Sequence, residues 1–197
     1  AWRAGQAGGT SSKDVRFVAE LIDSLKASYN IDPARIYADG VSNGGGMAFL
    51  LSCTLSDRIA AVGLVASAQF LPWKECKDER PVPMIAFHGT EDRFTPYRGG
   101  RSWVARDHVF PSIPGFTATW ARRNRCAERP AESRVAADVT RLAYTGCADD
   151  ADVVLYTIYG GGHTWPGGGP MPEWFAGSTS RGVDATRQMW AFFRAHS

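Results

Sequence analysis

A serine lies between two glycines where the chain is expected to turn sharply. The segment Gly40-Val41-Ser42-Asn43-Gly44 has the spacing G-x-S-x-G and follows the short apolar run Ile36-Tyr37-Ala38. Between a strand and a helix, this pattern places a serine at the apex of a strained turn, where its hydroxyl can act as a nucleophile. Gly40 and Gly44 would remove collisions with the strand and the helix. A passenger serine in an ordinary turn is the alternative, whereas a phosphate loop requires a Lys–Ser/Thr pair that this segment lacks.

A serine hydroxyl needs a base to take its proton. The histidines are His88, His108, His163 and His196. His163 lies in the glycine-rich segment 160–167, after the apolar run 153–159, so it could reach over the edge of a sheet toward Ser42. We predict that His163 is the base, with a surface-loop histidine as the alternative. His88 also follows an apolar run, but no comparable acid-bearing loop comes after it. We therefore expect His88 to be buried and to hold its own loop by hydrogen bonds.

The third candidate of this constellation is Asp92, in the segment His88-Gly89-Thr90-Glu91-Asp92. The order Ser42, Asp92, His163 is the chain order of triads in α/β-hydrolases. Asp92 would accept the Nδ1 proton of His163, fix the tautomer and stabilise the imidazolium; Glu91 is the alternative acid. The backbone N–H of Asn43, directly after Ser42, is the predicted oxyanion donor.

Trp165 lies two residues after His163. Its indole could pack against an aromatic acyl group or a polymer chain of the substrate. The alternative, which the sequence does not separate from it, is a tryptophan that anchors its own loop.

Strands and helices must alternate to bring these residues together. Helical spacing of apolar residues predicts a helix from Asp14 to Tyr29, and a glycine-rich turn over 40–46 precedes helical spacing from Met47. Further predicted strands span 60–67, 82–87, 140–144 and 153–159, and further helices span 116–124 and 185–194. Continuous apolar strands between helices indicate a mostly parallel sheet with helices on both faces, an α/β fold. Chemistry in such sheets gathers at the carboxyl ends of the strands.

Composition excludes several classes of protein. The 197 residues are 44% hydrophobic and 21% charged, which is ordinary for one globular domain over 1–197. A net charge of +2 gives no reason to expect a nucleic-acid partner. The longest nearly apolar stretch, Ile59–Ala68, is about half of what a bilayer span needs, so no membrane association is expected. The predicted chemistry requires no metal or organic cofactor, and the oligomeric state is not predicted.

Four widely spaced cysteines, Cys53, Cys76, Cys126 and Cys147, include no C-x-x-C pair typical of zinc sites. Four thiols allow three disulfide pairings. Sequential pairing, 53 with 76 and 126 with 147, is favoured because each bridge would close one excursion of the chain. Four free thiols in a cytosolic protein are the alternative, but an oxidising compartment fits the cysteines better.

Three blocks resemble a known family. Ile31-Asp32-Pro33-Ala34-Arg35-Ile36-Tyr37 leading into Gly-Val-Ser-Asn-Gly-Gly, then segments 88–92 and 162–167, are similar to the secreted polyhydroxybutyrate depolymerase and feruloyl esterase group. The resemblance extends over nearly the whole chain. It implies an α/β-hydrolase fold and hydrolysis of carboxylic esters, either of polyesters or of feruloyl and acetyl polysaccharides. It also implies export, to the periplasm or the extracellular medium, and the same three residues: Ser42, Asp92 and His163. Disulfides 53–76 and 126–147 fit the family as well.

The chain departs from this family at its beginning. Family members have earlier strands and a His-Gly-bearing loop that supplies a second oxyanion donor, and nothing here corresponds to them. We therefore expect a C-terminal portion of a longer catalytic domain, which is weakly active or poorly folded when expressed alone. A serine peptidase of the same fold and a non-catalytic hydrolase-like binding protein are the alternative functions.

Overall fold

Four parallel strands make up the part of the sheet that bears the predicted site. The computed structural model describes residue 2 and residues 13–104, 108–169 and 171–196. Its main sheet has the order β1-β2-β3-β8-β7-β6. The strands are β1 (Tyr37–Val41), β2 (Ala61–Val65), β3 (Met84–Gly89), β6 (Ala131–Ala136), β7 (Val139–Tyr144) and β8 (Val153–Ile158). Pairing is parallel from β1 through β2 and β3 to β8, and antiparallel between β8, β7 and β6. The parallel strands therefore end at one edge.

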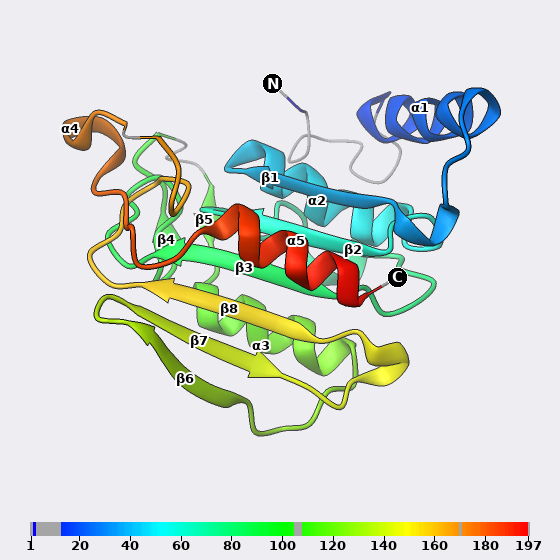
Figure 1. Ribbon diagram of the computed structural model, residues 1–197. Helices are drawn as coiled ribbons and strands as arrows, with labels where there is room; N and C mark the ends of the chain where they lie inside the picture. Colours follow the sequence, from blue (N-terminus) through cyan, green and yellow to red (C-terminus); the bar gives the residue numbers. More distant parts are fainter. Residues whose placement is uncertain (1, 3–12, 105–107, 170, 197) are drawn as a thin grey trace.

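Helices cover both faces of the sheet (Figure 1). The helices among the described residues are α1 (Lys13–Ser28), α2 (Asn43–Thr54), α3 (Ile113–Arg123), α4 (Glu173–Ala176) and α5 (Ala185–Ala195). The short segments β4 (Gly100–Arg101) and β5 (Val109–Phe110) pair separately, and single 3₁₀ turns span Pro33–Arg35, Trp73–Glu75 and Ala148–Asp150. In Figure 1, α5 crosses one face of the sheet, and α2 and α3 lie on the other.

Alternate residues of each central strand point to opposite faces and build two cores. Val62 and Leu64 of β2 pack with α2 and α3, whereas Ala61 and Val65 pack with Met189 and the rest of the α5 side. Because both faces are covered, the central strands are apolar along their length, as predicted for a parallel sheet. The predicted α/β fold class is confirmed.

The strand before Ser42, the start of α2 and strand β6 differ from the prediction, and the short segments β4, β5 and α4 were not predicted. The strand predicted at 36–38 continues to Val41, and α2 begins at Asn43 rather than after the glycines. Glycine disfavours helix interiors, but close packing of this turn outweighs the propensity. Strand β6 was not predicted, because Glu132, Ser133 and Arg134 are exposed at the sheet edge and leave no apolar pattern to detect.

The two sequential disulfides are present. Cys53 in α2 bonds Cys76, and Cys126 bonds Cys147, with sequence separations of 23 and 21 residues. Closing a loop of that length stabilises a fold by about 3 kcal/mol in the chain-entropy model. The predicted pairing is confirmed. Among the described residues, no helix combines the length and the apolar character that crossing a bilayer would need.

Candidate active site

Ser42 adopts the strained backbone that the G-x-S-x-G pattern predicts. It joins β1 to α2 with φ 55° and ψ −119°, a conformation that non-glycine residues rarely adopt. Two backbone hydrogen bonds hold the turn: the Ser42 N–H donates to Val65 O at 2.9 Å, and the Gly46 N–H donates to Ser42 O at 3.0 Å. Strain of this kind costs about 1–3 kcal/mol and persists only where the surrounding structure enforces it.

The glycines around Ser42 have unequal roles. A Cβ on Gly40 would lie 2.5 Å from the Gly44 carbonyl carbon, so Gly40 is required for the close approach of β1 to α2. A Cβ on Gly44 would have no heavy atom within 4 Å. The expectation that Gly44 relieves a collision is therefore wrong, because its Cα–H points into open space. Gly45 and Gly46 are crowded as well: a Cβ on Gly45 would meet the Ser67 side chain at 2.6 Å, and a Cβ on Gly46 would overlap the Phe70 ring.

Asn43 is the first residue of α2. The first N–H groups of an α-helix have no acceptor within the helix, and the helix dipole places partial positive charge there. Developing negative charge beside Ser42 would therefore be stabilised. The role of the Asn43 amide as an oxyanion donor stays a prediction.

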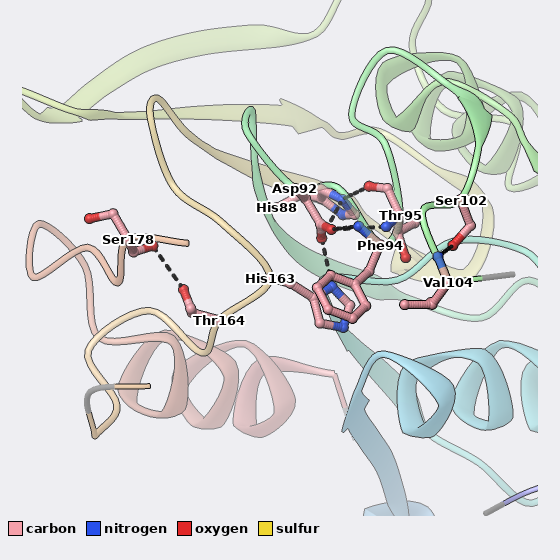
Figure 2. A network of polar contacts seen from close by, with 9 residues as sticks. All are labelled: His88, Asp92, Phe94, Thr95, Ser102, Val104, His163, Thr164 and Ser178. Atoms are coloured by element: carbon pink, nitrogen blue, oxygen red, sulfur yellow. Dashed lines mark hydrogen bonds and ion pairs between the residues drawn. The ribbon is translucent and has the colours of Figure 1, made fainter. Parts of the chain in front are cut away.

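Asp92 lies in the loop after β3, and its carboxylate is fixed by donors on both oxygens. Oδ1 accepts hydrogen bonds from the backbone N–H groups of Phe94 and Thr95, both at 2.8 Å. Oδ2 lies 2.9 Å from His163 Nδ1 (Figure 2). Burial raises the pKa of Asp92, but hydrogen bonds from His163 and His88 lower it by more, so the pKa lies well below its usual range. Asp92 is therefore an ionised acceptor for His163.

His88 is buried beneath this carboxylate. Its Nε2 lies 2.8 Å from Thr95 O and 3.3 Å from Asp92 Oδ2. A carbonyl oxygen only accepts, so the proton of the His88 ring lies on Nε2. The expectation of a buried histidine that holds its loop is confirmed. Its contact with Asp92 was not predicted, because the turn at 89–92 that folds the carboxylate back over His88 leaves no periodic signal.

His163 reaches Asp92 because the loop after β8 crosses over the end of β3. A Cβ on Gly89 would lie 2.2 Å from Gly161 O, which shows how closely the two backbones approach. The His163 N–H donates to Ala176 O at 2.6 Å, which ties the loop to the end of α4. The His163 side chain is 12% exposed. Since Nδ1 contacts Asp92, Nε2 is the nitrogen left for another partner.

Ser42 and His163 lie at the same edge of the sheet. Ser42 follows β1 and His163 follows β8, and these strands are parallel. The alternative acid Glu91 is exposed, whereas the buried Asp92 makes the contact with His163.

Two aromatic residues, Trp165 and Phe94, lie in the loops that carry His163 and Asp92. Trp165 is half-buried against the α5 core, and its Nε1–H donates to Thr186 Oγ1 at 3.0 Å. These are the contacts of a loop anchor, so its predicted part in substrate binding has no support from them. Phe94, which was not predicted, stacks on His163 with ring centroids 4.6 Å apart and planes 21° apart (Figure 2).

Known proteins resemble this chain in sequence and in fold. No family model matches it. Feruloyl esterase B of Piromyces equi is 34% identical over 168 residues, which cover 83% of this chain and 31% of that protein. Feruloyl esterase D of Neurospora crassa is 30% identical over 157 residues, 78% of this chain and 48% of that protein. The chain thus spans between about a third and half of the length of these relatives.

Among solved structures, an acetyl xylan esterase from Aspergillus awamori superposes with a TM-score of 0.59 at 14% identity. The superposition covers 91% of this chain and 66% of that one. At this identity the match supports the fold alone, and the fold is the one predicted from the alternation of strands and helices.

Proposed function

We propose that this chain, a relative of the feruloyl esterase and acetyl xylan esterase group of α/β-hydrolases, hydrolyses carboxylic esters with Ser42 as nucleophile. The observation that carries the proposal is the 2.9 Å contact between Asp92 Oδ2 and His163 Nδ1, at the sheet edge where Ser42 occupies its strained turn. The ionised Asp92 keeps the Nδ1 proton on His163 and leaves Nε2 to act as the base.

The reaction proceeds in two acyl transfers. His163 Nε2 takes the Ser42 hydroxyl proton as Ser42 Oγ attacks the ester carbonyl, and the negative oxygen of the tetrahedral intermediate is stabilised by the Asn43 N–H. His163 then donates the proton to the departing alcohol, which leaves an acyl-serine. Water, deprotonated by His163, attacks the acyl-serine and releases the acid, and Ser42 regains its proton. Asp92 stabilises the imidazolium in each half of the cycle.

The proposed substrates are feruloyl or acetyl esters of polysaccharides. The names of the sequence relatives support this class, and they offer no support for the polyhydroxyalkanoate polyesters that the sequence also suggested. Secretion is proposed on the ground of the two disulfide pairs, because disulfides form and persist in oxidising compartments.

Covalent labelling tests the nucleophile directly. A fluorophosphonate probe should label the wild-type chain at Ser42, and Ser42→Ala should abolish labelling. Ser133→Ala, at an exposed serine of β6, serves as the control and should label like wild type. Methyl ferulate, p-nitrophenyl acetate and a peptide amide, assayed in parallel, then separate an esterase from a peptidase. Labelling that persists in Ser42→Ala would overturn the proposal.

A further inference from the structure

A group of aromatic side chains extends outward from His163. Phe94 stacks on His163 at 4.6 Å and contacts Phe175 at 5.0 Å and Trp103 at 5.7 Å, and Phe175 contacts Trp174 at 5.7 Å, all between ring centroids. Phe94, Phe175, Trp174 and Trp103 are called the aromatic row below. It joins the loop after β3 to α4, which follows the His163 loop (Figure 1).

The aromatic row is open to solvent at its outer end. Trp174 is 81% exposed, Trp103 is 50% exposed and Phe175 is 40% exposed. Aromatic side chains contribute large apolar areas to cores and interfaces, so several of them in contact at the surface mark a binding surface. Because the inner end of the row stacks on the proposed catalytic base, a ligand on the row would lie near the candidate active site.

Charged groups accompany these rings. A hollow of about 260 Å³ lies between the β3 loop and α4, and Glu91, Arg93 and Glu173 line it together with Phe94, Trp174 and Phe175. Carboxylates accept hydrogen bonds and a guanidinium donates them. The hollow can therefore accept hydrogen bonds from the hydroxyl groups of a ligand and donate hydrogen bonds to them. A ligand with apolar ring faces and many hydroxyls matches this lining.

We propose that the aromatic row binds the polysaccharide chain that bears the ester, with sugar rings lying on Trp174 and Phe175. This inference rests on the proposed esterase function and adds the surface that holds the polymer. Pockets for small ligands enclose most of the ligand's surface. The exposure of Trp174 provides no such enclosure, whereas an extended chain can lie along an open row and continue past it.

Binding to a polysaccharide without ester groups tests this inference separately from catalysis. All proteins carry Ser42→Ala, and their affinity for soluble xylan stripped of esters is measured by affinity electrophoresis. Trp174→Ala should weaken binding about three- to tenfold, the worth of an aromatic contact. Trp103→Ala should weaken it in the same sense. Trp190→Ala is the matched control, because Trp190 is 52% exposed on α5 and lies outside the row; it should bind like the parent.

Three results of the xylan measurement would overturn the inference: no binding of xylan by the parent, equal binding by Trp174→Ala and the parent, or an equal loss of binding in Trp190→Ala. Displacement of xylan by methyl ferulate would assign the row to the acyl group instead. Trp174-dependent adsorption to polyhydroxybutyrate particles without xylan binding would assign it to a polyester. Failure of probe labelling at Ser42 would overturn only the proposed function, since the binding measurement needs no turnover.

Discussion

The loops after β3 and β8 meet at the candidate site, yet they hold their side chains in opposite ways. Asp92 is buried, and its two oxygens contact two backbone N–H groups, His163 and His88. Around α4, in contrast, Trp174 has four-fifths of its surface in solvent. Proton transfer requires atoms in fixed positions, and buried polar contacts hold them there. Removing one partner of such a contact is correspondingly destabilising. Contact with a large ligand needs exposed rings, which contribute little to stability. Removing side chains from each region tests this contrast.

The largest effect is expected at the buried carboxylate. Asp92→Asn cannot hold the Nδ1 proton on His163 in the same way, and a change of this kind costs about 10⁴-fold in kcat. Hydrolysis of p-nitrophenyl acetate by the variant measures it. Glu132→Gln on exposed β6 is the control and should retain the wild-type rate. A loss below tenfold in Asp92→Asn would show that the carboxylate has a structural role only.

The second effect in size is expected at Gly40, the crowded glycine of the turn that carries Ser42. Gly40→Ala places a Cβ 2.5 Å from the Gly44 carbonyl carbon, and such overpacking destabilises by about 1–3 kcal/mol. Gly44→Ala meets open space and should change the free energy of unfolding by less than about 1 kcal/mol. Urea titration of both variants gives the comparison. Equal losses would contradict the close approach of β1 and α2.

Substitution of His88 tests how much its hydrogen bond to Thr95 stabilises the loop that carries Asp92. His88→Leu leaves the Thr95 carbonyl without its partner, which costs about 1–3 kcal/mol. His88→Gln keeps a side-chain N–H and should recover part of that stability. Urea unfolding of the two variants is the measurement, and identical unfolding midpoints would show that the hydrogen bond to Thr95 contributes nothing.

Lowering the pH should reduce the free energy of unfolding through the Asp92 carboxyl group. The folded-state pKa of Asp92 is depressed, so its ionised form contributes stability above the unfolded-state value of about 3.9. That contribution is lost as pH falls below about 4. Thermal unfolding between pH 3 and 6 should therefore show a steeper loss for wild type than for Asp92→Asn. Parallel curves would mean that the carboxyl is not held in its charged form.

The smallest effect is expected at the exposed end of the row. Trp174→Ala should change the free energy of unfolding by less than about 0.5 kcal/mol, because surface substitutions away from packed features are nearly neutral. Urea titration alongside His88→Leu provides the comparison. A loss as large as that of His88→Leu would show that α4 is part of the folded core.

Sequence patterns predicted those features that short segments determine. The spacing around Ser42, the apolar runs of β2, β3 and β8, and the closing helix were all detectable, and the structure contains each of them. Contacts that depend on loop conformation were not detectable. The position of His88 under Asp92 and the stacking of Phe94 on His163 arise from turns without periodicity. The start of α2 was misplaced, because propensity against glycine is a local property and the packing of Gly45 on Ser67 is not.

The hydrogen that His88 donates to Thr95 also restricts how charge can move within the protein. Nε2 of His88 carries a hydrogen and donates it to the Thr95 carbonyl oxygen. The same nitrogen has no lone pair free to accept a proton. Nε2 of His88 therefore cannot take a proton from the Asp92 carboxyl group. Of the two nitrogens of His163, Nδ1 contacts Asp92, so Nε2 is the atom available to exchange a proton with solvent or substrate.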